Sequence, residues 1–145
     1  MSTSVLHQLL QSGQLVAALS ESYQQREQRG LDRLLRLPVR TYLQDYDLLF
    51  RHVSLWLSTQ GYELTNKQPH LVLAKVCGQL APRTSVGEVV RCRHALKYQG
   101  ETPTGIALAA LSTILSVVAE ARQQLLLLPE QSCSVGDAVG SRAES

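Results

Sequence analysis

The chain has 145 residues, about the length of one domain and enough to bury a hydrophobic core without disulfides or metal ions. Its 14 basic and 12 acidic side chains give a formal net charge of +2, too balanced for the long-range positive field of a protein that coats nucleic acid. Any contact with phosphate must therefore be local. The three cysteines, an odd number spread along the chain, fit neither a disulfide framework nor a paired-thiolate zinc site: Cys77, Cys92 and Cys133.

The same composition predicts a cytoplasmic protein with reduced thiols. The N-terminus has no basic region followed by an apolar stretch and no small-residue cleavage site, so no secretion signal is expected. The apolar runs are expected to be shorter than the roughly 20 residues needed to cross a bilayer, so no contact with a membrane is expected.

Two helical patterns occupy the first part of the chain. A short helix, capped by Thr3 or Ser4, is expected to end near Gly13. From Gln14 a second helix is expected to lead into a polar stretch that Gly30 interrupts. Both rest on apolar residues at helical spacing: Val5, Leu6, Leu9, Leu10, Leu15, Val16, Leu19 and Tyr23.

The longest and clearest helix is predicted after Pro38 and is ended by Gly61. One broad apolar face runs along it: Val39, Tyr42, Leu43, Tyr46, Leu49, Phe50, Val53, Trp56 and Leu57. A further helix is expected over residues 70–80, because Pro69 suits a first helical turn.

The next helix is expected to begin with a capping box, because Glu88 follows Ser85 by three residues. A loop is expected over residues 99–104. The segment after it is expected to form a helix that is apolar almost all round, a pattern that favours a place at the centre of a bundle. Small residues on this last helix suit either the core or a dimer seam: Gly105, Ala107, Ala109, Ala110 and Ala119.

These patterns together predict an all-α fold, an antiparallel bundle of about five to six helices in a single domain over residues 1–128. Strand-like alternation is not expected anywhere. Residues 129–145 carry few large apolar groups to offset their ordering entropy and are expected to form a disordered tail.

The densest functional candidate lies within two helical turns of the predicted helix after Ser85. Arg93 and Lys97 are four residues apart and share a face, as do Arg91 with His94 and His94 with Tyr98. Cations placed so closely repel one another unless an anion lies among them, so Arg91, Arg93 and Lys97 are candidate phosphate-binding residues. The alternative is a solvated basic helix end, whose charges favour the helix C-terminus.

The string RCRHALKYQG, together with the preceding GY turn and TNKQPH segment and the following apolar helix, resembles the HEPN superfamily of helical bundles over residues 42–128. The family motif is an arginine, a polar residue, three further residues and a histidine. Arg93 matches the arginine and His94 the polar position, whereas Tyr98 stands where the family has its histidine.

The resemblance implies RNA cleavage without metal, in a cleft that two protomers build together, with Arg93, His94 and Tyr98 as catalytic candidates. A phenol with an ordinary pKa near 10 is a poor base at neutral pH, so Tyr98 is a weak substitute for histidine. The prediction is therefore a HEPN-like domain with weak or absent nuclease activity, which binds RNA, a nucleotide or a protein partner in a defence or toxin–antitoxin type assembly. A homodimer is expected through the faces that bear Arg93 and the last helix.

Two alternatives stay open. The first is an active, metal-independent endoribonuclease that uses Arg93 with His94 or Tyr98, so whether the chain is an enzyme is not decided by the sequence. The second is a plain helical adaptor for another protein.

The remaining polar candidates are weaker. His70 is expected to be a surface or capping histidine, with a position facing the Arg93 helix as the alternative, and His52 is expected at the edge of the core. Asp45 and Asp47 point to different faces of a helix and are expected to form salt bridges. No histidine pair has a metal-ligand spacing, so no metal and no other cofactor is expected.

Overall fold

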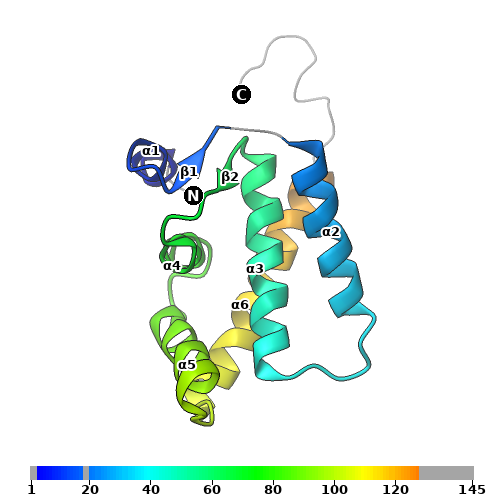
Figure 1. The fold of residues 1–145 in the computed structure, drawn as a ribbon, viewed down its shortest axis with the longest axis vertical. Coiled ribbons are helices and arrows are strands. Elements are labelled where there is room, and N and C mark those ends of the chain that lie inside the picture. Colours follow the sequence, from blue (N-terminus) through cyan, green and yellow to red (C-terminus); the bar gives the residue numbers. More distant parts are fainter. Residues whose placement is uncertain (1–2, 18–19, 128–145) are drawn as a thin grey trace.

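A computed structural model describes residues 3–17 and 20–127 of the chain (Figure 1). The described residues form six helices and one sheet of two very short strands, which confirms the predicted all-α class. The elements are α1 (Thr3–Gln11), β1 (Leu15–Val16), α2 (Glu21–Leu35), α3 (Tyr42–Thr59), β2 (Glu63–Leu64), α4 (Pro69–Leu80), α5 (Val86–Gln99) and α6 (Gly105–Leu127). The predicted tail over residues 129–145 lies outside the described residues.

Helix α3 is the centre of the fold. Helix α2 packs on one side of it, α4 and α5 lie on the other, and α6 runs behind it (Figure 1). Its start is fixed by a capping box, in which the Gln44 amide donates to the Thr41 hydroxyl at 3.2 Å and the Thr41 amide donates to the Gln44 side chain at 2.9 Å. Its end lies at Gln60, followed by Gly61 with a φ of 92°, as the sequence predicted.

The hydrophobic core forms where α3, α4 and α6 meet. These three helices supply many of its fully buried side chains: Leu49, Val53, Leu57, Leu73, Val76, Ile114 and Val118. Leu9 of α1 and Val89 of α5 are also fully buried in this core. Burial of each such side chain contributes about 1.5–3 kcal/mol before entropy is counted, so these contacts fix the positions of α3, α4 and α6 relative to one another.

The expectation of a helix beginning at Gln14 is wrong. Leu15 and Val16 form β1, which pairs antiparallel with β2. The chain turns at Gly13, with a φ of 79°, and the Thr65 hydroxyl donates to the Gly13 carbonyl at 2.8 Å. This long-range pairing outweighs the helical spacing of two apolar residues, and strands occur where none were expected.

Gly30 does not interrupt α2 but lies buried in the middle of it. A Cβ atom at this position would collide with the guanidinium of Arg51 on α3. The guanidinium is the far end of a flexible side chain that could move aside, so the glycine leaves room for Arg51 and does not set the distance between α2 and α3.

The capping box predicted at Ser85 is also wrong. Ser85 is the residue before α5, but its side chain makes no capping hydrogen bond. The Glu88 carboxylate instead accepts from Arg91 and from the Thr104 hydroxyl, which is 2.9 Å away. Charge-assisted bonds to Arg91 are stronger than the bond to a backbone amide that the motif implied.

Helix α6 does not lie at the centre of the bundle. Only 28% of the residues in an 18-residue stretch within Gly105–Gln124 are buried, along one stripe: Ala107, Ala110, Leu111, Ile114 and Val118. By length and a mean hydropathy of 1.5 this segment also meets the criterion for a membrane span, alone among the described helices and contrary to the expectation of no such run. Core helices of soluble proteins meet the same criterion, so it does not by itself indicate a membrane.

Candidate functional site

The structure places the residues of the cluster predicted on α5 in separate surroundings. Arg93 and Lys97 line a pocket of about 360 Å³ between α3, the start of α4 and α5. The Arg93 Cζ lies 5.4 Å from the centroid of the buried Tyr46 ring. We call this cavity the Arg93 pocket; it is lined by Leu43, Tyr46, Asp47, Phe50, His70, Arg93 and Lys97.

His70 is half-buried in this pocket, so the alternative position facing the Arg93 helix is the one observed. Its Nδ1 lies 3.0 Å from the Tyr46 hydroxyl, and its ring centroid lies 5.2 Å from that of Phe50. Burial and the nearby charges of Arg93 and Lys97 lower its pKa. The imidazole is therefore neutral at pH 7, one ring nitrogen donating and the other accepting.

Tyr46 contributes its aromatic ring and its hydroxyl group to the lining of the pocket. Its side chain is buried, which raises the pKa of the phenol far above its usual range despite the opposing charge of Arg93. The hydroxyl is therefore protonated at every physiological pH and orients the His70 ring.

The Arg93 pocket carries uncompensated positive charge. Among the described residues no ion pair includes Arg93 or Lys97. Asp47 is the acidic residue of the lining, and its carboxylate lies 3.7 Å from the Arg51 Nε. Arg51 is also paired with Glu27, at 3.5 Å, so it neutralises Asp47 only in part. Two cations and a neutral histidine thus face a cavity with a single carboxylate, an excess of positive charge that suits an anion.

Arg91 lies outside this pocket and already has a partner. Its Nε and Nη2 donate to the two carboxylate oxygens of Glu88 at 2.9 and 2.8 Å. These bonds, with the one from Thr104, lower the pKa of Glu88 to about 2. Glu88 therefore links the start of α5 to Thr104 before α6, with Arg91 as its partner on the same helix. Of the three predicted phosphate-binding residues the structure brings only Arg93 and Lys97 together.

His94 and Tyr98 form a second, separate pair. Their ring centroids lie 4.8 Å apart, both side chains are exposed, and neither lines the Arg93 pocket. Successive residues of a helix differ by about 100°, so Arg93 shares its face with Lys97 and not with His94 or Tyr98. The catalytic candidates thus do not meet in one cavity within a single chain.

Four pocket residues were missed as site residues in the sequence: Leu43, Tyr46, Asp47 and Phe50. Tyr46 and Phe50 are spaced four apart on an apolar face, a pattern far more typical of core than of a site. The local signal available was the polar Asp47 between them, and only the packing of α4 and α5 shows that the face is incompletely covered.

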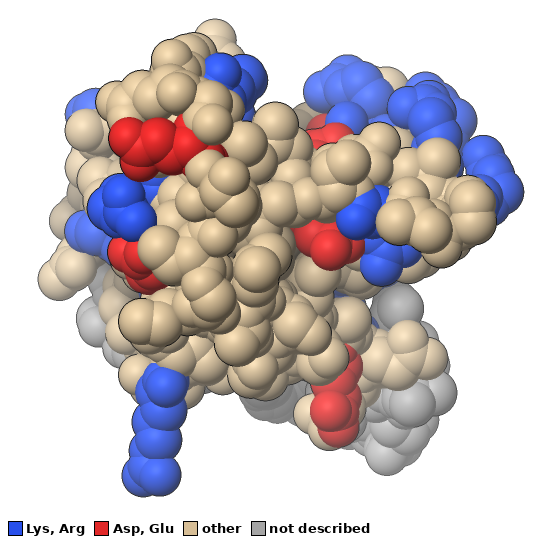
Figure 2. Space-filling model, turned by 90° about the horizontal axis from the view of Figure 1, so that it is seen from below, with Lys and Arg blue, Asp and Glu red and all other residues tan. Residues whose placement is uncertain are grey.

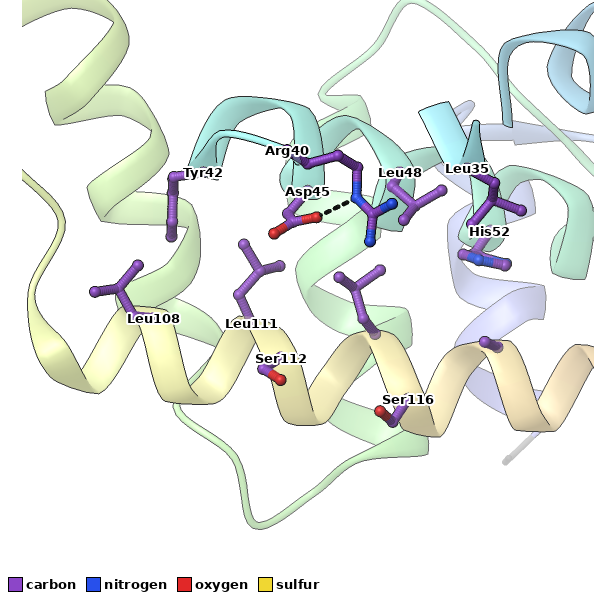
Figure 3. A pocket seen from close by; sticks show the side chains of 12 residues that line it. Leu35, Arg40, Tyr42, Asp45, Leu48, His52, Leu108, Leu111, Ser112 and Ser116 are labelled. Carbon is purple, nitrogen blue, oxygen red and sulfur yellow. Dashed lines mark hydrogen bonds and ion pairs between the residues drawn. The ribbon is translucent and has the colours of Figure 1, made fainter. Parts of the chain in front are cut away.

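A larger pocket of about 430 Å³ lies between α3 and α6 (Figure 3). Its arginine, Arg40, is neutralised by Asp45, which accepts from its Nε at 2.6 Å. At the other end, the Nδ1 of buried His52 lies 3.1 Å from the Arg122 Nη1. Burial and Arg122 lower the pKa of His52 to about 4. This pocket offers no free cation from its lining residues and is a weaker anion site.

The surface charge agrees with a local site. In the view of Figure 2, lysine and arginine side chains stand in separate groups, divided by acidic side chains and by broad uncharged surface. As predicted, Asp45 and Asp47 both form salt bridges, to Arg40 and Arg51.

Comparisons with protein-family models, curated proteins and solved structures find no match for this chain. Within the described residues, no group of three or more His, Cys, Asp or Glu side chains is placed to hold a metal ion. The function is therefore argued from the Arg93 pocket itself.

Proposed function

We propose that the Arg93 pocket binds the phosphate of a nucleotide or of single-stranded RNA, and that the chain acts as a binding or regulatory partner with weak or absent nuclease activity. The observation that carries this proposal is the presence of Arg93 and Lys97, without carboxylate partners among the described residues, in one pocket with His70. The further assignment to a HEPN-like domain of a defence or toxin–antitoxin assembly rests on the motif around Arg93.

A phosphate would lie between the Arg93 guanidinium and the Lys97 ammonium. Arginine offers two parallel N–H donors to phosphate oxygens, and lysine adds a mobile point charge. A hydrogen bond to a charged group contributes about 1.5–3 kcal/mol, which is tenfold or more in affinity. The pocket volume of about 360 Å³ falls within the range of small-ligand sites, and the aromatic edges of Phe50 and His70 suit a base.

The positions of the other candidates support weak or absent nuclease activity. Cleavage without metal needs a base within hydrogen-bond reach of the attacking hydroxyl. His94 and Tyr98 lie on a different face of α5 from Arg93 and so cannot act beside it in the same chain.

A metal-independent endoribonuclease is the second candidate, and one observation favours it. His70, neutral at pH 7 because its pKa is lowered, lies in the pocket with Arg93. If its Nδ1 donates to the Tyr46 oxygen, its Nε2 is an acceptor and could take a proton from a 2′-hydroxyl. In this case His70, rather than His94 or Tyr98, replaces the histidine of the motif.

The test is the affinity for a labelled single-stranded RNA and for AMP, measured with a chelator present. Arg93→Ala is expected to weaken binding by tenfold or more. It removes no ion pair among the described residues, and the loss of its contact with the Tyr46 ring is expected to lower the melting temperature only slightly. Arg29→Ala, which removes an exposed arginine from α2, is the matched control and retains wild-type affinity. Equal affinity of wild type and Arg93→Ala would contradict the proposal.

The same RNA separates the alternatives. The wild type is expected to leave it intact, whereas cleavage that His70→Gln abolishes identifies the ribonuclease. A chain that neither binds nor cleaves RNA or nucleotide, but copurifies with another protein, is the plain adaptor.

A further inference from the structure

Helix α6 presents an uncharged face to solvent. We call it the α6 outer face; its members are exposed: Ile106, Leu108, Ala109, Ser112, Thr113 and Ser116. Ile106 and Leu108 are 63% and 52% exposed, and the first charged residue of α6 is Glu120. A continuous apolar and small-residue surface of this length is uncommon on a monomeric soluble protein and marks an interaction site.

The α6 outer face and the Arg93 pocket belong to opposite sides of α3. At about 100° per residue, the pocket residues of α3 lie on one side of that helix and the residues that face α6 lie on the other. The first set is Leu43, Tyr46, Asp47 and Phe50, and the second is Tyr42, Asp45, Leu48 and His52. Figure 1 likewise shows α6 behind α3, while α4 and α5 flank it.

Grooves flank the α6 outer face on both sides. One is the pocket of about 430 Å³ in Figure 3, bordered by Leu108, Ser112 and Ser116. The other, of about 370 Å³, lies between α6 and the loop before α5 and is bordered by Arg83 and Ile106. Small side chains between two grooves allow another helix to approach to about 8 Å, with its own side chains entering the grooves.

The charges at the two ends of this face are complementary. Arg83 borders the groove beside Ile106, near the start of α6, and Glu120 lies exposed about four turns further along. No ion pair among the described residues includes either side chain. An antiparallel copy of the same helix would bring Glu120 of each chain to Arg83 of the other, and it would also set the two helix dipoles in opposition.

We propose that a second copy of the chain packs on the α6 outer face, with the two α6 helices antiparallel about a two-fold axis near Ser112 and Thr113. Such an axis makes both contacts identical, as in the commonest class of oligomer. The 16 residues from Gly105 to Glu120 are about 24 Å long, and a strip about 20 Å wide along them covers roughly 480 Å² per copy, smaller than the roughly 800 Å² of a standard interface, so a weak dimer is expected.

This dimer differs from the one that the HEPN resemblance implies. The Arg93 pockets face away from the shared α6 helices, so each pocket is built by one chain and the two do not form a composite cleft. The proposal depends on α6 and on Arg83 beside it, and stands whether or not the Arg93 pocket binds phosphate.

The first test is the molar mass of the full chain over a range from about 10 to about 500 μM, which covers the concentrations at which a small interface forms, measured by light scattering. The wild type is expected to be a dimer. Ser116→Arg places a long charged side chain at the seam and is expected to give a monomer with the wild-type circular dichroism spectrum. Gln25→Arg, which adds the same charge to the exposed surface of α2, remains a dimer.

The second test exchanges the complementary charges. Glu120→Arg and Arg83→Glu are each expected to raise the dimer dissociation constant several-fold, and the two together are expected to restore it. A monomeric wild type, a dimeric Ser116→Arg variant or a double exchange without rescue would overturn the proposal. So would a monomer that floats with phosphatidylcholine vesicles, because the α6 outer face would then bind lipid.

Discussion

Acid should destabilise the fold through the His52 side chain. His52 on α3 is 8% exposed, and its Nδ1 faces the Arg122 guanidinium at 3.1 Å. Burial and the arginine charge lower the pKa of His52 from 6.5 to about 4 in the folded protein. Between these two pH values the unfolded chain binds a proton that the folded chain does not. The contribution of His52 to the unfolding free energy is therefore fully present above about pH 6.5 and is lost as the pH falls towards 4.

The size of this effect follows from the two pKa values. Comparing pH 7.5 with pH 5, a histidine that titrates at 6.5 when unfolded and at about 4 when folded destabilises the protein by about 2 kcal/mol. This is a large part of the roughly 5–15 kcal/mol that stabilises a typical domain. His70, whose pKa is also lowered, acts in the same direction.

Urea unfolding at the two pH values measures the effect. In His52→Gln the difference in unfolding free energy between pH 7.5 and pH 5 is expected to shrink by about 2 kcal/mol, because glutamine accepts a bond from Arg122 without titrating. An unchanged pH dependence in His52→Gln would refute the reasoning.

Three further results are expected. Thr41→Ala removes the capping box of α3 and should destabilise the protein by about 1 kcal/mol in urea unfolding, whereas no change would show that the cap is dispensable. The Cys77 thiol, whose pKa burial raises to about 12, should resist iodoacetamide until the protein unfolds, as mass spectrometry of the labelled peptide would show. Tyr98→His should produce no RNA cleavage in chelator, since the new imidazole would lie outside the Arg93 pocket; cleavage would show that the α5 motif acts as in the resembled family.

Most helices could be predicted because their signals are local. The stop of α3 at Gly61 is as expected, and Pro69 occupies the first turn of α4. Val39, expected on the apolar face of α3, lies before that helix and is exposed. The last helix was expected to be apolar almost all round and central, and its uncovered face was not foreseen, because the pattern of one helix does not reveal how many neighbours it has.

The errors occurred where distant residues decide the local structure. The turn at Gly13 is held by Thr65, which lies 52 positions along the chain. Helix α2 continues through Gly30, where the guanidinium of Arg51 on α3 occupies the space that a side chain would fill. Neither contact leaves a trace in the neighbouring sequence, so periodicity alone favoured the wrong assignment.

Only part of the candidate site could be predicted, because some of its contacts join residues that are distant in the sequence. Helical spacing correctly placed Arg93 and Lys97 on one face of α5, since four residues nearly complete a turn. The same spacing could not show that Glu88 binds Arg91, or that His70 and Tyr46 complete the pocket from α4 and α3.

The most direct test of the central claim is a titration of the ¹⁵N-labelled full chain with AMP, followed by amide chemical shifts. The Arg93 pocket account predicts that shifts concentrate at Tyr46, Phe50, His70, Arg93 and Lys97, that amides of the α6 outer face stay in place, and that Arg93→Ala loses the response. Shifts that cluster at Arg40 and Ser116 instead, or that are unchanged in Arg93→Ala, would contradict it.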